Sequence, residues 1–140
     1  MGDTYRWRGE NVATIEVENV ISKHLNSTEV VVYGVEIPGQ EGRAGMAAIN
    51  KEETSRIDFQ ELSQNLKLNL PAYAKPLFIR LMTQLEHTGT FKAIKNKLVE
   101  EGYNIKKLTD QIYYYDQKDQ SYRELTQSIY ENILNCNIRL

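Results

Sequence analysis

The residue best placed to do chemistry in this sequence is Lys92, which follows the segment His87-Thr88-Gly89-Thr90-Phe91. Glycine accepts backbone angles that other residues avoid, and threonine hydroxyls bond to nearby backbone, so this segment is typical of an exposed turn. A lysine at the end of such a turn is a movable positive charge, which suits an incoming phosphate or carboxylate. Most surface lysines are solvated and have no further role. The pattern alone therefore indicates either an anion-binding residue or an ordinary surface charge.

The composition argues against several functional classes. A chain of 140 residues is long enough for about one domain with its own core. The 17 basic and 19 acidic residues give a net charge of −2, whereas a nucleic-acid-binding domain is usually basic, so we expect no nucleic-acid partner. The single cysteine, Cys136, can form no disulfide within the chain and favours a reducing compartment, the cytoplasm. No apolar run approaches the roughly 18 residues of a membrane span, so we expect a soluble segment.

No known motif for phosphate or metal binding occurs. The sequence contains no Gly-rich phosphate loop, no zinc-ligand pattern and no Ser/His/Asp set, and we therefore expect no metal site. The lone histidines His24 and His87 favour structural or solvated roles. The start of the chain is dense in aromatic and charged residues, which predicts that the chain is cut from a longer protein.

The elements before the lysine are predicted from periodicity and turn residues. Two brief strands are expected between Tyr5 and Val12, around a tight turn at Gly9-Glu10-Asn11. An amphipathic helix follows, with Thr14 as its N-cap. The β-branched run at 29–37 and the run at 43–51 are expected to pair as an antiparallel hairpin.

The second half of the chain positions Lys92 itself. A helix is expected to begin at the N-cap Asp58 and to end near Leu70, before Pro71. A third main strand at 77–82 leads into the lysine loop, and a short helix at 93–101 follows it. Further on, a short strand at 113–115 and a last helix at 125–134 are expected. Together these elements predict an α+β fold: a small sheet of about three strands packed with helices, and a separate N-terminal two-stranded β-ribbon.

Two separated stretches resemble the adenylate-forming acyl-CoA ligases, and within them the fatty acid transport protein or very long-chain acyl-CoA synthetase group. The stretch from Gly2 to Val12, continuing through Glu16-Val17, is similar to the hinge and hairpin that open the family's mobile C-terminal domain. Leu70-Pro71-Ala72-Tyr73-Ala74-Lys75-Pro76, followed by Thr88-Gly89-Thr90-Phe91-Lys92, is similar to its closing motif. The resemblance covers essentially the whole chain in the right order. It extends to residues 103–140, because the transport-protein group continues through a tyrosine-containing segment and a terminal helix.

The resemblance implies a two-step reaction of the parent enzyme. A fatty acid and ATP give an acyl-adenylate and pyrophosphate, and coenzyme A then displaces AMP to give the thioester. Residues 1–140 would be the single mobile C-terminal (lid) domain, with 103–140 as its extension. The partner would be the large N-terminal adenylation domain of the same polypeptide, which carries most of the ATP, Mg²⁺ and fatty acid sites. We therefore expect the lid alone to bind no cofactor and to be inactive, and the parent to be cytoplasmic or associated with the cytoplasmic face of a membrane.

The resemblance also implies roles for individual residues. Lys92 would take part in adenylation, between the fatty-acid carboxylate and the phosphate. The hinge would lie at Gly2 and Asp3, either of which could be the pivot. The turn residues would help to line the pantetheine tunnel of coenzyme A: Gly9, Glu10 and Asn11. The exposed ribbon residues would contact either coenzyme A phosphates or the partner domain: Arg6, Trp7 and Arg8.

Two alternatives accompany these expectations. Lys95 and Lys97 lie close to Lys92, but a helical face of lysines is usually solvated, and we expect that here. A stand-alone, non-catalytic binding or regulatory module with the same fold would carry the same motifs. A gene that continues upstream into a large adenylation domain separates the enzyme from this alternative.

Overall fold

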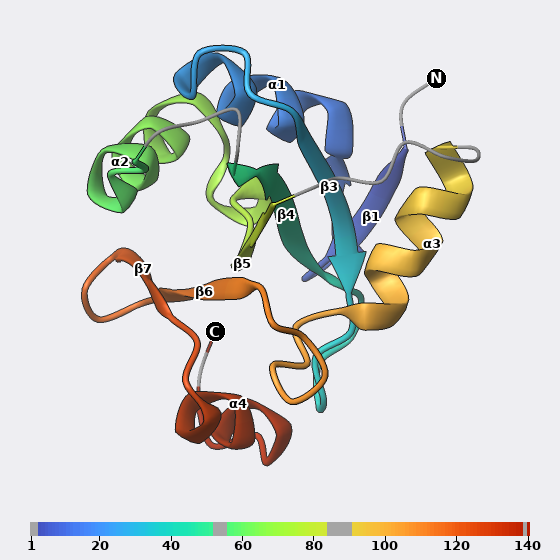
Figure 1. Ribbon diagram of the computed structural model, residues 1–140. Coiled ribbons are helices and arrows are strands. Elements are labelled where there is room, and N and C mark those ends of the chain that lie inside the picture. The colour runs from blue at the N-terminus through green and yellow to red at the C-terminus, as the bar shows by residue number, and fades with distance from the viewer. Residues whose placement is uncertain (1–2, 52–55, 84–90, 139) are drawn as a thin grey trace.

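The computed structural model describes residues 3–51, 56–83, 91–138 and 140, and of residues 91–93 it describes the backbone alone. Its helices and strands follow one another along the chain as β1 (Thr4–Trp7), β2 (Glu10–Ala13), α1 (Thr14–His24), β3 (Val30–Val35), β4 (Ala44–Asn50), α2 (Phe59–Asn69), a 3₁₀ turn η2 (Ala72–Ala74), β5 (Phe78–Met82), α3 (Phe91–Glu101), β6 (Gln111–Asp116), β7 (Ser121–Glu124) and α4 (Gln127–Leu134). Figure 1 shows α1 and α2 on one side of the main sheet, α3 beside β1 and β3, and α4 at the end nearest β6 and β7. The α+β class expected from the sequence is confirmed.

The main sheet is formed by five described strands in the order β3-β4-β5-β6-β7. Neighbouring strands are antiparallel except for β4 and β5, which are parallel and place Met46 opposite Phe78. A parallel pair needs a long crossover connection, and α2 lies within it. The predicted hairpin is confirmed, because β3 and β4 pair from Val30 with Ile49 to Val35 with Ala44.

The core explains why the hairpin strands are almost entirely apolar. Every residue of β3 is buried, as is every residue of β4 except Asn50. Helices α1 and α3 both pack on β3, and β1 packs on β3 and β4. Strands covered on both faces lose the alternation of apolar and polar residues, which is why these runs are nearly continuous in the sequence.

The helix starts confirm one sequence expectation and correct another. Asp58 is the N-cap of α2, because its side chain accepts hydrogen bonds from the Gln60 and Glu61 amides, each at 3.1 Å. Thr14 is not the N-cap of α1 but its first residue, and Ala13 occupies the cap position without a side-chain bond. The hydroxyl of Thr14 instead donates to the carbonyl of Asp3 at 3.1 Å.

Residues 103–140 are part of the same sheet. Strand β6 pairs with β5 and β7 pairs with β6, so the five described strands exceed the expected number by two. The aromatic side chains of the extension pack inward: Tyr103 stacks on Phe78 with ring centroids 4.3 Å apart, and Tyr115 is buried. Strand β7 was not predicted from the sequence, because Tyr122 is its one buried residue and the strand shows no alternation of apolar and polar residues.

Candidate functional site

The ribbon turn is shifted by one residue from the predicted position. Arg8 and Gly9 connect the strands with φ angles of 51° and 83°, and Trp7 pairs with Glu10. Two consecutive positive φ angles are typical of the tight turn that suits the twist of a hairpin. The expected turn at Gly9-Glu10-Asn11 is therefore wrong in its last two residues, which are the first residues of β2. All three residues remain exposed at the end of the ribbon.

A pair of glycines fixes the ribbon on the sheet. Gly34 and Gly45 face each other across β3 and β4. A Cβ on Gly34 would lie 2.9 Å from the Cβ of Tyr5, and a Cβ on Gly45 would collide with the Tyr5 hydroxyl. Because neither glycine has a side chain, the Tyr5 ring can lie against the strands and the ribbon docks closely. Backbone contacts extend the attachment, since the Arg43 amide donates to the Arg6 carbonyl at 2.7 Å.

The described ribbon residues divide into an inner and an outer face. Trp7 is 3% exposed, so the expectation that it lies on the surface is wrong and its side chain belongs to this domain's own core. Arg6 and Asn11 are cross-strand partners and both are exposed. Side chains opposite each other in a strand pair lie on one face. This outer face can therefore offer a guanidinium and an amide to a polar ligand.

Arg8 is held at the turn by contacts within the chain. Its guanidinium lies over the Trp7 ring, 4.9 Å from the centroid, and donates to the carbonyl oxygen of Leu140. An arginine over an indole ring gains a favourable interaction with the ring face. Arg8 therefore connects the turn of the ribbon with the last described residue of the chain.

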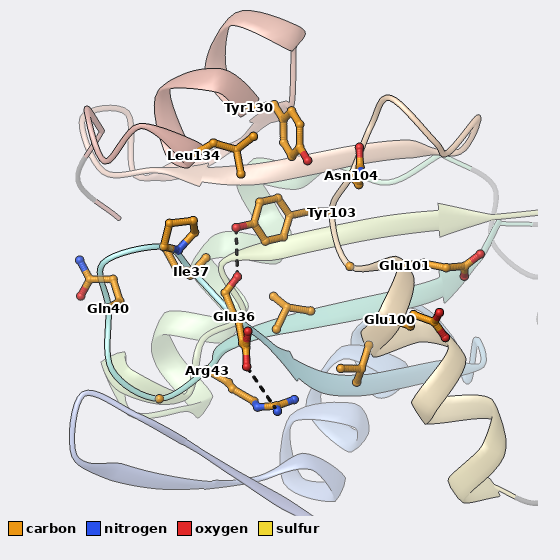
Figure 2. A pocket seen from close by; sticks show the side chains of 15 residues that line it. Glu36, Ile37, Gln40, Arg43, Glu100, Glu101, Tyr103, Asn104, Tyr130 and Leu134 are labelled. Carbon is orange, nitrogen blue, oxygen red and sulfur yellow. Dashed lines mark hydrogen bonds and ion pairs between the residues drawn. The ribbon is translucent and has the colours of Figure 1, made fainter.

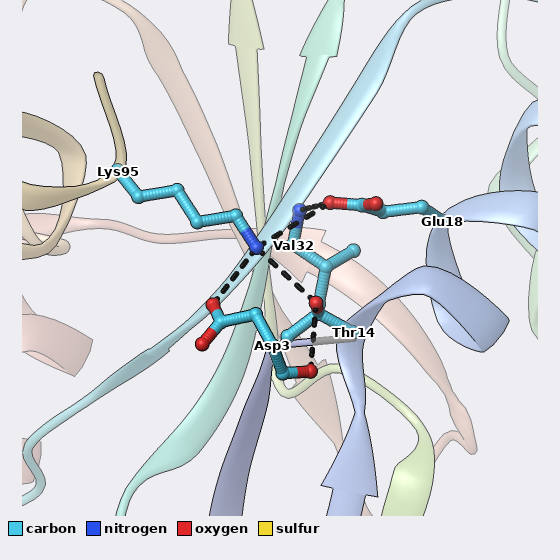
Figure 3. A network of polar contacts seen from close by, with 5 residues as sticks. All are labelled: Asp3, Thr14, Glu18, Val32 and Lys95. Atoms are coloured by element: carbon cyan, nitrogen blue, oxygen red, sulfur yellow. Dashed lines mark hydrogen bonds and ion pairs between the residues drawn. The ribbon is translucent and has the colours of Figure 1, made fainter. Parts of the chain in front are cut away.

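Lys95 lies in a polar cluster with Asp3, Thr14 and Glu18, which we call the Lys95 cluster (Figure 3). The Lys95 ammonium donates to the Asp3 carboxylate at 3.0 Å and to the Thr14 hydroxyl at 3.2 Å, and its Nζ is 3.7 Å from a Glu18 carboxylate oxygen. Lys95 is 6% exposed, so the expectation that it is solvated is wrong. One sequence signal was available, because Leu98 lies three residues further on and shares its helix face.

Glu18 is the most buried acid of the cluster. Burial raises the pKa of its carboxyl above the usual value, while the Val32 amide and Lys95 act in the opposite direction. The Val32 amide donates to the Glu18 carboxylate at 2.8 Å, which fixes this side chain against β3. The cluster thus joins α1, β3, α3 and the segment before β1.

The remaining predicted site residues lie at or beyond the ends of the described segments. Gly2 and the loop residues Thr88, Gly89 and Thr90 lie outside the described residues. Lys92 is the second residue of α3, and its side chain lies outside the description. Asp3, the other expected hinge residue, lies directly before β1 in the Lys95 cluster.

A groove of about 740 Å³ lies away from these residues, between the β3–β4 loop, the end of α3 and α4 (Figure 2). The Tyr103 hydroxyl donates to the carbonyl of Glu36 at 3.0 Å, and the Glu36 carboxylate is 3.7 Å from the Arg43 guanidinium. Tyr130 and Leu134 of α4 also line it. The groove contains no predicted site residue, and its mixed charges favour no single class of ligand.

Two classes of feature are absent from the described part of the chain. There, no group of three or more His, Cys, Asp or Glu side chains is arranged to hold a metal ion. None of the helices in the same part combines the length and the hydropathy that a transmembrane segment needs.

The fold of this chain also occurs in part of two solved structures. It resembles coronafacic acid ligase from Pectobacterium brasiliense with a TM-score of 0.64 and 21% identity, over 80% of this chain and 21% of that one. A double mutant of o-succinylbenzoate CoA synthetase from Bacillus subtilis gives a TM-score of 0.54 and 20% identity, over 73% of this chain and 20% of that one. At these identities the likeness shows the fold alone.

Sequence comparison then gives the family. Residues 16–92, more than half of the chain, match the AMP-binding enzyme C-terminal domain, and the chain belongs to this family. The chain is 43% identical over 140 residues to long-chain fatty acid transport protein 6 of Mus musculus, covering all of this chain and 23% of that protein. It is 46% identical over 132 residues to long-chain fatty acid transport protein 1 of Homo sapiens, covering 94% of this chain and 20% of that protein. The chain thus spans about a fifth of the length of these curated relatives, and the family resemblance is confirmed.

Proposed function

We propose that this chain is the mobile C-terminal lid of a fatty acyl-CoA ligase. The observation that carries the proposal is the similarity of nearly the whole of this chain to long-chain fatty acid transport proteins. The match covers only about a fifth of the length of those proteins. The rest of such a protein would be the large adenylation domain, and it would supply the binding sites for ATP, Mg²⁺ and the acyl chain. The parent would be cytoplasmic or attached to the cytoplasmic side of a membrane.

The proposed reaction has two steps that need different partners. In the first, the carboxylate of a fatty acid attacks the α-phosphate of ATP, and pyrophosphate leaves. In the second, the thiol of coenzyme A attacks the acyl carbonyl of the adenylate and releases AMP. The lid would rotate about the hinge at Gly2 and Asp3 between these steps, because a few backbone dihedral angles can absorb such a motion.

Lys92 would serve the first step. A carboxylate and a phosphate repel each other, and an ammonium group between them offsets that repulsion as the bond forms. Lys92 is the second residue of α3, and this position supports the role because the helix fixes the backbone there. The large domain would provide the anions.

The outer face of the ribbon would serve the second step. The tip at Gly9 is open, since a Cβ there would meet no atom within 4 Å, and a thin pantetheine chain could pass close to the backbone. Arg6 and Asn11 beside it could donate hydrogen bonds to phosphate or amide oxygens of coenzyme A. Glu10, also exposed, would line the same edge. The buried Trp7 would act only by holding the ribbon in place.

The test is a Lys92→Ala substitution in the full-length protein that contains this chain. We expect acyl-adenylate formation to fall about 10²- to 10³-fold, as when other electrostatic contacts to a reacting group are removed. Transfer from a supplied acyl-adenylate to coenzyme A should be nearly unchanged, because Lys92 would have left the site by then. Pyrophosphate exchange measures the first step and thioester formation the second.

The control is Lys97→Ala, which removes the same charge from the same helix. Wild-type adenylation by the Lys92→Ala protein would refute the role of Lys92. A gene that encodes no adenylation domain ahead of this chain would replace the whole proposal with the stand-alone binding module.

A further inference from the structure

Asp3 is held at both of its polar ends. Its carbonyl oxygen accepts hydrogen bonds from the Thr14 amide at 2.9 Å and from the Thr14 hydroxyl at 3.1 Å. Its carboxylate accepts from the Lys95 ammonium at 3.0 Å. The backbone of Asp3 is therefore tied to the start of α1, and its side chain is tied to α3.

The partners of Lys95 differ in how easily they can leave. A lysine ammonium removed from water needs nearby negative charge, and both Asp3 and Glu18 provide it. Glu18 is fixed by the Val32 amide at 2.8 Å and is largely buried. The Asp3 side chain is 56% exposed, so water can solvate it once the pair opens. The Asp3 pair can therefore separate while the Glu18 pair keeps Lys95 compensated.

Lys95 also lies close to Lys92 along the helix. Residues three positions apart are neighbours on a helix surface, and they are separated by about 4.5 Å along the axis. Any force that Asp3 exerts on Lys95 therefore acts on the helical turn that carries Lys92. The Lys95 cluster connects the expected pivot with the helix that presents the expected adenylation residue.

We propose that Lys95 is a positioning residue that couples the backbone at Asp3 to the first turns of α3. With the ion pair closed, α3 is held in the orientation that serves adenylation, and the pair opens when the pivot changes its dihedral angles. This inference rests on the proposed function for the roles of Asp3 and Lys92. The coupling itself is a property of this chain and can be measured separately.

The first measurement needs no ligase activity. In the full-length protein, Asp3→Asn removes the charge with little change of shape, and amide hydrogen exchange is followed by mass spectrometry. We expect peptides from α3 to exchange about three- to fivefold faster, as for the loss of a partly exposed ion pair. Asp3→Glu, which keeps the charge, should restore most of the protection. Glu16→Gln, the same charge change at an exposed position of α1, should leave α3 unchanged.

The second measurement separates positioning from a merely structural role. Asp3→Asn should slow acyl-adenylate formation about three- to fivefold and change thioester formation from supplied adenylate less than twofold. The same substitution should have no further effect in a Lys95→Met/Glu18→Gln background, which lacks the ammonium and leaves no buried carboxylate unpaired. A full effect of Asp3→Asn in that background would show that Asp3 acts without Lys95.

The outcomes distinguish the two proposals. Unchanged exchange in α3 would overturn the coupling, whatever the activity. Faster exchange with an equal loss in both half-reactions would overturn the positioning role and leave the lid function standing. A wild-type protein with neither half-reaction would overturn the proposed function, and the role in adenylation with it.

Discussion

Arg80 gives the sharpest test of what holds the C-terminal extension to the sheet. It is 4% exposed on β5, where its Nε and Nη2 donate to the Asp110 carboxylate at 2.9 and 2.7 Å. Its Nη1 donates to the Glu101 carboxylate at 3.0 Å. One guanidinium thus joins β5, the end of α3 and the segment before β6. The perturbation is Arg80→Met, which keeps much of the apolar stem and removes the charge.

The expected cost follows from burial. Breaking a buried ion pair by removing one partner costs about 3–5 kcal/mol, because the other charge loses its compensation. Asp110 and Glu101 both keep some contact with water, so we expect the lower end of this range, about 3 kcal/mol. With a urea m-value of about 2 kcal/mol/M, the unfolding midpoint should fall by about 1.5 M.

Arg123→Met is the matched control. Arg123 also contacts two carboxylates, Asp116 at 3.4 Å and Asp119, but its side chain is 59% exposed. Exposed pairs contribute about 0–1 kcal/mol, so this variant should unfold within about 0.5 M urea of the wild type. The assay is equilibrium urea unfolding at pH 7, followed by circular dichroism.

The result that would refute the reasoning is an equal loss of stability in the two variants, because burial would then not set the cost. A further variant checks the mechanism. Combining Arg80→Met with Asp110→Asn and Glu101→Gln removes the uncompensated charges, and it should regain at least about 1 kcal/mol of the free energy of unfolding. A triple variant no more stable than Arg80→Met would assign the loss to packing.

Three other substitutions have defined outcomes. Tyr103→Phe should lose about 1 kcal/mol at pH 7, because the hydrogen bond to the Glu36 carbonyl disappears. Burial raises the pKa of Tyr103 from 10.0 to about 12, so in this pH range the hydroxyl stays protonated in the folded state and ionises in the unfolded state. The free energy of unfolding of the wild type should therefore fall as pH rises from 10.0 to about 12, and urea unfolding should show a smaller fall for the variant. Gly45→Ala should cost about 1–3 kcal/mol in thermal unfolding because its Cβ meets the Tyr5 hydroxyl, and a wild-type melting temperature would contradict the docking described for the ribbon. Asp58→Ala should cost about 1 kcal/mol in the same assay, and no loss would contradict the N-cap.

The fold was predictable where the sequence carries local patterns. The β-branched run of β3 and the capping residue Asp58 each specify their element through neighbours along the chain. Strand β7 has no such pattern, and pairing with β6 makes it a strand. The burial of Trp7 could have been predicted, because Tyr5 and Trp7 alternate with the polar residues Thr4 and Arg6 along β1.

The site was predictable only in part. Lys92 and the ribbon were found through family motifs, and their proposed roles need groups that this chain lacks. The environment of Lys95 could not be predicted, because its carboxylate partners, Asp3 and Glu18, lie far from it in sequence and approach it only in the folded chain. Helical spacing placed Lys95 on the same helix face as Leu98, but it carried no information about the carboxylates of Asp3 and Glu18 that pack against this face.

The pairing of β6 with β5 has a consequence for any shortened form of this protein. Strand β5 is buried from Phe78 to Leu81, with Arg80 as its one charged residue, and it pairs with β4 on one side and β6 on the other. A chain that ended after Gly102 would leave the second side with unpaired N–H and C=O groups, next to an uncovered Phe78 ring. Such an edge is a template for pairing with another molecule. The tyrosine-rich extension therefore prevents β5 from pairing with another molecule, and truncations of this chain at Gly102 should aggregate.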